Sequence, residues 1–253
     1  MTPTTRAPAH ITILSLLGLG IVWFAAAKTG NDPDILPGPA AVWQVIVSES
    51  QNGKLWFHMS QTFGRVIAAF CLAMAVGSAL GIWLGSSPRA NRWLDPWVTV
   101  MLNLPALVII VLCYLWIGLN ELAAIVAVAL NKTAMVTVTI REGVRALDRG
   151  VADMAQVYRM SYLSRLRHVI WPQLGPFVAA STRNGLAVIW KIVLVVEFLG
   201  RSNGVGFQIH LYFQLFDTAS VLAYAISFTS VMLAVEYLIV QRWEARATAW
   251  RAV

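Results

Sequence analysis

The residues that could carry out chemistry in this chain are few and scattered. The four histidines stand far apart in the sequence. No H-E-x-x-H zinc motif, no G-x-S-x-G nucleophile turn and no G-x-x-x-x-G-K-[ST] phosphate loop occurs. The sequence therefore predicts no enzyme and no ATP binding through such a loop, so energy for any transport has to come from a partner. The histidines are His10, His58, His168 and His210.

Three cations interrupt stretches that are otherwise apolar. Inside a membrane span an ionisable side chain costs roughly 2.5 to 3.5 kcal/mol, so it usually faces the protein interior or a water-filled path. Arg183 and Lys191 are eight residues apart, about 80° around a helix, and can share a broad face with Asn184. These residues predict a translocation path, and the alternative is that they pair with Glu197 or Glu236 and only fix helix packing. The candidate path residues are Asn131, Lys132, Arg183, Asn184, Lys191 and Glu197.

A second stretch of chemical interest, Asp153 to Pro172, is polar and lies between two long apolar runs. Its apolar residues recur at three- and four-residue spacing and its arginines occupy other positions, which predicts an amphipathic helix over about 150–166. Pro172 is expected to end that helix. A cytosolic partner could reach it, although it could also be a helix that merely links two spans. The apolar positions are Ala155, Tyr158, Tyr162 and Leu166.

The composition predicts a polytopic membrane protein. The 253 residues are 58% hydrophobic and 12% charged, whereas about a quarter of a soluble domain is charged. Mean hydropathy is +0.67 and the pI is near 9.8. The arginines are scattered through short loops, so membrane topology explains the net charge of +7 better than nucleic-acid binding does. Cys71 and Cys113 lie in separate apolar runs and predict neither a disulfide nor a metal site.

Six apolar stretches are long enough to cross a bilayer as helices, for which about 20 residues suffice. Gly77, Gly81 and Gly85 are spaced four apart in the second stretch and predict the close approach of another helix. Pro105 predicts a kink in the third. A short amphipathic helix is expected over about 40–47. The spans are approximately 9–27, 62–85, 97–117, 122–140, 174–196 and 218–240.

The distribution of Lys and Arg predicts the orientation, because these residues concentrate on the cytoplasmic side. With the N-terminus inside and six crossings, twelve fall in inner segments, against Lys28, Lys54 and Arg201 outside. We therefore expect an all-α membrane protein with both termini in the cytoplasm and the Asp153 to Pro172 stretch on the same side. The inner residues are Arg6, Arg89, Arg92, Arg141, Arg145, Arg149, Arg159, Arg165, Arg167, Arg242, Arg246 and Arg251.

The polar stretch resembles the EAA loop of ABC importer permeases. The pattern of that loop is an acidic residue, two alanines, a glycine a few residues later and a Leu-Pro pair some twenty residues on. Asp153 takes the acidic place, Ala155 is the second alanine, and a Trp-Pro pair ends at Pro172. Two residues depart from the pattern: Met154 replaces the first alanine, and Arg159 stands where the glycine is expected.

Further features, in their order and spacing, make the chain similar to the nitrate/sulfonate/taurine branch of these permeases. The resemblance implies a type I importer fold with one transmembrane domain over 1–253. It also implies a second copy of the chain, two cytosolic ATPases that hold ATP and magnesium, and a periplasmic binding protein. The features are Leu36–Pro39, Val42-Trp43, Thr62–Phe70, Asp95-Pro96, Leu104-Pro105, Val196-Glu197 and Trp250-Arg251. The residues expected at the ATPase contact are Asp153, Met154, Ala155, Arg159, Ser161 and Pro172.

The resemblance leaves the solute open, since relatives in this branch move sulfonates, taurine or nitrate, and others move pyrimidines or flavins. The excess of cations over acids in the spans favours a small anionic solute. A secondary transporter or channel would need no ATPase and often shows internal repeats, which are not evident here. We therefore expect a permease subunit in the lipid bilayer of a bacterial inner membrane that binds no cofactor and no nucleic acid itself.

Overall fold

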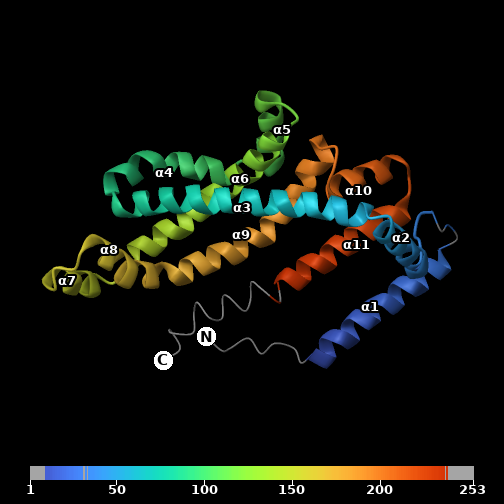
Figure 1. Ribbon diagram of the computed structural model, residues 1–253, viewed down its shortest axis with the longest axis horizontal. Coiled ribbons are helices and arrows are strands. Elements are labelled where there is room, and N and C mark those ends of the chain that lie inside the picture. Colours follow the sequence, from blue (N-terminus) through green and yellow to red (C-terminus); the bar gives the residue numbers. More distant parts are fainter. Residues whose placement is uncertain (1–8, 31, 33, 237, 239–253) are drawn as a thin grey trace.

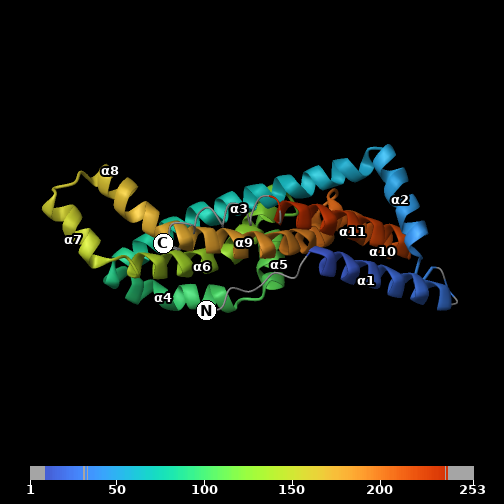
Figure 2. The ribbon, with the colours of Figure 1, turned by 90° about the horizontal axis from the view of Figure 1, so that it is seen from below.

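The computed structural model describes residues 9–30, 32, 34–236 and 238, and within them all regular structure is helical. Four long helices run roughly along the long axis of the molecule (Figures 1 and 2). This confirms the predicted all-α class. The four helices are α3 (Lys54–Ser86), α6 (Glu121–Arg145), α9 (Trp171–Gly200) and α11 (Thr218–Val235).

The most extensive helix pair is α3 with α6, and the glycine stripe of α3 makes it possible. A Cβ atom on any of the three glycines would lie 2.6 to 2.8 Å from the Cβ of a β-branched residue of α6, closer than real Cβ contacts come. The predicted close approach of another helix is therefore confirmed, because only glycine leaves room for these side chains. The facing pairs are Gly77 with Val136, Gly81 with Ile140 and Gly85 with Val144.

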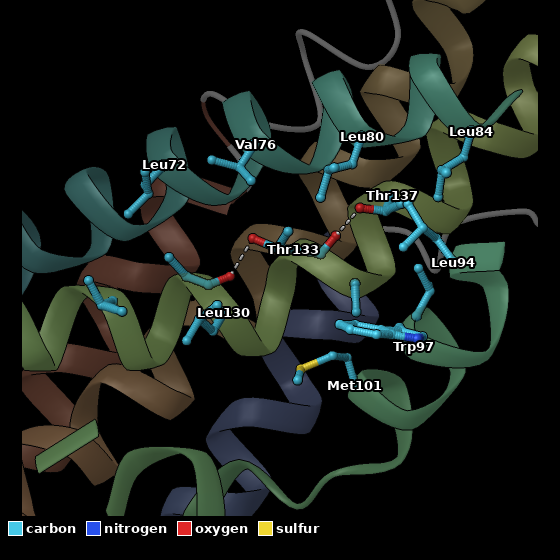
Figure 3. Close-up of a pocket in the computed structure, with 14 residues that line it drawn as sticks. Leu72, Val76, Leu80, Leu84, Leu94, Trp97, Met101, Leu130, Thr133 and Thr137 are labelled. Carbon is cyan, nitrogen blue, oxygen red and sulfur yellow. Dashed lines mark hydrogen bonds between the residues drawn. The ribbon is translucent and has the colours of Figure 1, made fainter. Parts of the chain in front are cut away.

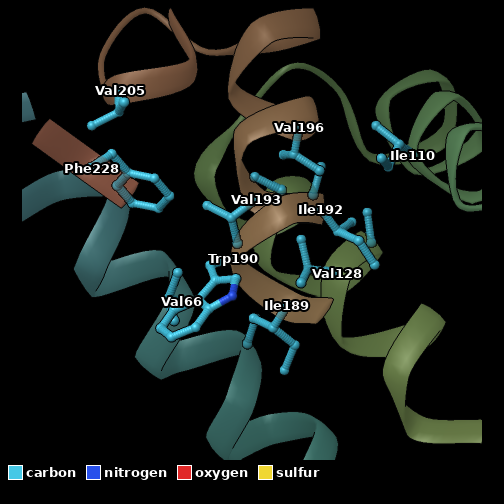
Figure 4. Packing of buried hydrophobic residues seen from close by; sticks show 14 of the residues in the cluster. Val66, Ile110, Val128, Ile189, Trp190, Ile192, Val193, Val196, Val205 and Phe228 are labelled. Atoms are coloured by element: carbon cyan, nitrogen blue, oxygen red, sulfur yellow. The ribbon is translucent and has the colours of Figure 1, made fainter. Parts of the chain in front are cut away.

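Buried apolar side chains from the long helices join those of α5 (Ala106–Ile117) and α10 (Val205–Gln214) in one cluster (Figure 4). Trp190 of α9 lies near Val66 of α3 and Phe228 of α11 in this cluster. The cluster fixes α9 against three neighbours, so the polar residues that α9 carries have defined positions.

The third apolar run is broken into α4 (Pro88–Asn103) and α5, which meet at an angle of 99°. Leu104 is extended, with φ −69° and ψ 126°, as expected of a residue before proline. Pro105 lacks the N–H that would continue the helix. The break is thus sharper than the predicted kink, residues 97–117 do not form one continuous helix, and α5 turns out of the line of α4 while it packs on α6 and α9 (Figure 1).

Several helices differ in extent from the predictions. Helix α3 begins at Lys54, before the predicted start at 62, and the expected short helix over 40–47 is α2 (Pro39–Gln51). Helix α1 (Ala9–Thr29) matches the first predicted span closely. The last predicted span ends at 240, and residues 237, 239 and 240 of it lie outside the described residues. Arg6 and the three arginines of the tail, Arg242, Arg246 and Arg251, also lie outside them.

Within the described part, three helices are long and apolar enough to cross a membrane, and the bent pair α4 and α5 would make a fourth. The three are α3, α6 and α11. The chain is therefore a membrane protein, while six crossings and cytoplasmic termini stay predictions.

Candidate functional site

The polar stretch from Asp153 to Pro172 forms three short elements instead of the one predicted helix. Helix α7 (Arg149–Val157) is followed by α8 (Tyr162–Arg165) and a π-helical turn, η1 (Leu166–Ile170), which leads directly into α9. The prediction of a continuous helix over 150–166 was wrong in extent. Pro172 does not end a helix either: the π-helical turn η1 runs directly into α9, and Pro172 lies in the first turn of α9.

Arg159 makes the turn that ends α7. Its φ of +47° lies in the left-handed region, and the N–H of Met160 donates to the carbonyl of Ala155 at 3.0 Å, as in a Schellman helix end. A glycine would adopt this conformation freely, and an arginine adopts it at a cost of about 1 kcal/mol. The residue that departs from the EAA pattern therefore still forms a sharp turn.

The side chains of this region divide into an inner and an outer set. Ala155 is 1% exposed, and α7 packs on η1. Val157 is 80% exposed, and with its neighbours it forms an apolar surface at the end of the molecule opposite α2 (Figures 1 and 2). Exposed apolar side chains that lie together are common at contact surfaces. The exposed apolar residues are Met154, Val157, Tyr158 and Leu163, and Asp153, Arg159, Ser161 and Pro172 are also exposed.

Lys132 of α6 lies deep in the helix bundle and is 2% exposed. Its Nζ donates to the backbone carbonyl of Asn184 on α9 at 3.3 Å and lies 2.9 Å from Sδ of Met135. Gly185 provides the space, because a Cβ there would lie 3.3 Å from Cε of Lys132. Among the described residues no carboxylate lies within 4.0 Å of this ammonium group. A buried cation balanced only by a carbonyl and a thioether is costly, and such residues are commonly functional.

Polar side chains without partners lie near Lys132. Asn184 of α9 is exposed and Asn131 of α6 is partly buried. Neither side-chain amide makes a hydrogen bond with another described residue. Both amides therefore keep donors that water or a partner molecule can satisfy. The structure thus brings the ammonium of Lys132 to the backbone of Asn184 at the contact of α6 and α9, and Asn131 is the chain neighbour of Lys132.

The other two candidate cations lie on exposed parts of α9. Nε of Arg183 is 3.9 Å from Oε1 of Glu236, so the pairing with an acid that the sequence left open is present for this residue. Lys191 borders a hollow of about 310 Å³ between α9 and α11, which Glu236 also lines. Its ammonium forms no ion pair with another described residue.

Glu197 belongs to a different environment, a polar cluster at the far end of α9. Its carboxylate is fully buried and accepts from Arg65 at 2.6 Å, from the hydroxyl of Thr62 at 2.9 Å and from the N–H of Gly206 at 2.8 Å. Arg65 also donates to Glu121 at 2.7 Å. A role for Glu197 in the path stays a prediction, but its oxygens are occupied by protein donors.

The backbone after α9 is built around this carboxylate. Gly204 has a φ of +109°, and a Cβ there would collide with the carboxylate of Glu197. A Cβ on Gly206 would lie 2.8 Å from Cβ of Glu197. The chain can therefore wrap closely around Glu197 only because both residues are glycine.

Sequence reasoning missed this cluster, although a signal was present. The predicted topology places Arg65, Glu121 and Glu197 at the same end of three different spans. An arginine at the edge of one span with acids at the same depth on two others is the pattern of a buried ion-pair network. The glycines that follow Glu197 give a second signal, because they permit close backbone approach.

The described residues combine an all-helical membrane fold with an exposed apolar surface at one end and a buried cation without a carboxylate partner in the middle, as expected of a transport component. Among the described residues no group of three or more His, Cys, Asp or Glu could hold a metal ion. Residues 77–246 match the family of binding-protein-dependent transport system inner membrane components, and the chain belongs to this family. The predicted family of ABC importer permeases is thereby confirmed, and the chain is a transport subunit, not an enzyme.

Two relatives and one solved structure illustrate the match. The chain is 31% identical over 192 residues to the putative aliphatic sulfonates transport permease protein SsuC of Escherichia coli (strain K12), covering 76% of this chain and 73% of the relative. It is 26% identical over 237 residues to the taurine transport system permease protein TauC of the same organism, covering 92% and 86%. The inward-facing MetNI methionine ABC transporter gives a TM-score of 0.64 at 12% identity, covering 74% of this chain and 93% of that chain, which shows a common fold.

Proposed function

We propose that two copies of this permease, with two cytosolic ATPases, import a small anionic organic solute that a periplasmic binding protein delivers. The name of the family supports delivery by a binding protein, and relatives described as sulfonate and taurine permeases support a sulfonate-like solute. In this proposal the chain crosses a bacterial inner membrane six times with both termini in the cytoplasm. ATP and magnesium are held by the partner ATPases.

The observation that carries the proposed charge of the solute is the environment of Lys132. Its ammonium is buried, and in the described part no acid neutralises it. Two unit charges about 8 Å apart interact by about 2 kcal/mol at an effective dielectric constant of ~20. A solute anion beside Asn131 and Asn184 would feel this attraction without touching the lysine. The attraction would offset part of the cost of dehydrating the anion and is weak enough to allow its release.

The two amides fit the same solute. Each side-chain amide of Asn131 and Asn184 can donate two hydrogen bonds, and neither donates to another described residue. Sulfonate oxygens are acceptors, so an anion that reaches either amide could satisfy it. A neutral pyrimidine or flavin nutrient would satisfy the amides equally well but would leave the charge of Lys132 unbalanced, which makes it the less favoured alternative.

Transport by the Lys132→Met variant tests the charge. The permease would be reconstituted in liposomes with its ATPases and its binding protein, and uptake of labelled taurine would be measured beside ATP hydrolysis. Methionine has a similar shape without charge, so uptake is expected to fall about 30-fold, as a loss of about 2 kcal/mol implies, with ATP hydrolysis unchanged. Lys54→Met is the matched control, because Lys54 is exposed at the start of α3.

Two results would contradict the anionic assignment: normal uptake by Lys132→Met, or a cognate binding protein that holds only a neutral ligand. The second result would leave the importer architecture standing and would favour the pyrimidine or flavin alternative. Taurine uptake in liposomes without any ATPase would instead remove the importer proposal itself.

The apolar surface on α7 and α8 is proposed as the contact with the ATPases. Ala155 is buried, so a charged residue there would disturb the packing of α7, whereas Val157 is 80% exposed and reports on docking alone. Val157→Glu is expected to leave membrane insertion intact and to lower uptake at least tenfold, while the ATPases continue to hydrolyse ATP. Gln51→Glu adds the same charge at the opposite end, on α2, and serves as the control. Unchanged uptake by Val157→Glu would count against this contact surface.

A further inference from the structure

The chain leaves the helix bundle at the end of α6 and returns to it at the start of α9. Helix α6 ends at Arg145 and α9 begins at Trp171, and the stretch between them carries α7, α8 and η1. This stretch extends beyond the ends of the long helices (Figures 1 and 2). Among the described helices, α7 and α8 pack mainly on η1. The apolar surface on α7 and α8 is therefore connected to the bundle mainly through the turn after α6 and through η1.

The side chain of Gln173 joins these two connections. Its Oε1 accepts from the backbone N–H of Asp148, in the turn after α6, at 2.9 Å. Its Nε2 donates to the carbonyl of Val169, in η1, at 3.1 Å. The carboxylate of Asp148 accepts from the N–H of Gly150 at 2.7 Å, so the turn that leads into α7 has a defined course. Gln173 thus ties the turn before α7 to the turn after α8, and we call these two hydrogen bonds the Gln173 link.

The entry to α9 needs such a link because its own backbone is weakly connected. Pro172 and Pro176 have no N–H, so each removes a hydrogen bond from the helix that continues from η1. Prolines and π-helical turns are the features at which helices bend. Without a side-chain link, α7 and α8 would swing at this point and leave α9 unmoved.

Gln173 lies on the face of α9 that contacts α6. Phe177 follows it by one turn, and a Cβ on Gly143 of α6 would lie only 2.7 Å from Cγ of Phe177, so the two helices meet closely there. Asn184 is eleven residues beyond Gln173, which places it about 20° around and about 16 Å along α9. Its carbonyl accepts from Lys132 of α6. One face of α9 therefore carries the Gln173 link at one end and the contact with Lys132 at the other.

Helix α4, the other neighbour of α6 near this end, gives a less direct connection to Lys132. An apolar groove of about 400 Å³ lies between α3, α4 and α6 (Figure 3), and no residue of α4 is buried. The hydroxyls of Thr133 and Thr137 in the groove lining donate to carbonyls of α6 itself at 2.8 Å, so they do not hold α4. A displacement of α7 and α8 is thus carried toward Lys132 by α9.

We propose that Gln173 is a positioning residue for transport, which makes α7, α8 and η1 move together with α9. When the ATPases displace α7 and α8, the Gln173 link carries the displacement to α9 and so to the carbonyl of Asn184 that Lys132 binds. The inference rests on the proposed ATPase contact on α7 and α8 and on the proposed path at Lys132. In this role Gln173 touches neither the ATPases nor the solute.

The amount of taurine imported per ATP hydrolysed tests this role, in liposomes that hold the permease with its ATPases and its binding protein. Gln173→Leu keeps a similar volume and removes both hydrogen bonds, so uptake per ATP is expected to fall about tenfold, with unchanged affinity for the ATPases. Gln173→Glu keeps the acceptor for Asp148 and loses the donor to Val169, so a fall of about threefold is expected. Gln214→Leu makes the same change at an exposed glutamine that ends α10, and should leave uptake per ATP unchanged.

The possible results separate the Gln173 link from the contact surface. Wild-type uptake per ATP in Gln173→Leu would overturn the link and leave the ATPase contact, which Val157→Glu tests, standing. Weaker binding of the ATPases to Gln173→Leu would also overturn it, because Gln173 would then shape the contact surface. Hydrogen exchange of the wild-type complex needs no variant: the amide of Asp148 should exchange at least tenfold more slowly than a free amide. Exchange at the rate of a free amide would show that the link is absent.

Discussion

The two most deeply buried charged sites of the helix bundle have opposite surroundings. At one end, Glu197 is fully buried and receives three hydrogen bonds, one of them from Arg65, which itself is bound to a second acid. In the middle, Lys132 is almost as deeply buried and has only a carbonyl and a thioether as neighbours. Burial alone therefore does not separate these two charges, but their partners do.

This difference follows from how proteins compensate buried charge. The cluster around Glu197 joins α3, α6, α9 and the turn before α10, so each member holds the others in place. Removing one member of such a cluster leaves another charge buried and uncompensated. In the native chain the buried charge of Lys132 has no compensating acid among the described residues. Fold stability alone would not favour such a charge. This contrast supports the proposal that the charge of Lys132 acts on the solute.

The largest effect is expected from breaking the compensated site. Glu197→Ala leaves Arg65 without its buried acid and opens a cavity in the turn that wraps around Glu197, so the free energy of unfolding should fall by about 3 to 5 kcal/mol. Thermal unfolding of the purified protein in detergent measures this loss. Glu142→Ala is the control, because Glu142 is half exposed, and its ion pairs should contribute less than about 1 kcal/mol. Equal losses in the two variants would show that the Glu197 cluster is not the structural centre we describe.

The opposite sign is expected at the uncompensated site. Lys132→Met removes a buried charge and keeps the volume, so stability should rise by about 1 to 3 kcal/mol in the same unfolding measurement. Combined with the expected loss of taurine uptake, one substitution would increase stability and reduce transport. A loss of stability comparable to that of Glu197→Ala would place Lys132 with the structural charges and end the contrast.

Features set by the spacing of residues on one helix were predicted better than features that require residues of different helices to lie at the same depth in the bundle. The stripe of Gly77, Gly81 and Gly85 predicted close packing because four-residue spacing alone puts these residues on one helix face. The cluster of Arg65 with Glu121 and Glu197 was missed because its members are far apart in the sequence and meet only when the ends of three helices are aligned. Lys132 was identified from its position in an apolar run, but its burial and its neighbour Asn184 required the structure.

Backbone turns were predicted less well, for two different reasons. Pro105 indicated a change of direction, yet nothing local specifies an angle of 99°, which packing of α5 on α6 and α9 determines. Arg159 was placed inside a helix because it lies among apolar residues that recur at three- and four-residue spacing. Its left-handed conformation is imposed by the hydrogen bond from Met160 to Ala155 and by the packing of α7 on η1.

The smallest effect, and the finest test of the contrast, is expected at Lys191. This side chain is exposed at the hollow between α9 and α11, so Lys191→Gln should change the free energy of unfolding by less than about 0.5 kcal/mol. If it contributes to the positive potential along the path, taurine uptake should fall about fivefold or less, since water weakens its field.

The salt dependence of uptake distinguishes the role of Lys191 from that of Lys132. The Debye length shortens from ~10 Å at 0.1 M salt to ~3 Å at 1 M, which screens exposed charges far more than buried ones. Raising the ionic strength should remove the difference in uptake between Lys191→Gln and the wild type, whereas the deficit of Lys132→Met should persist. If both deficits vanished in high salt, the charge of Lys132 would be acting through water, and its burial in this structure would not describe the transporting state.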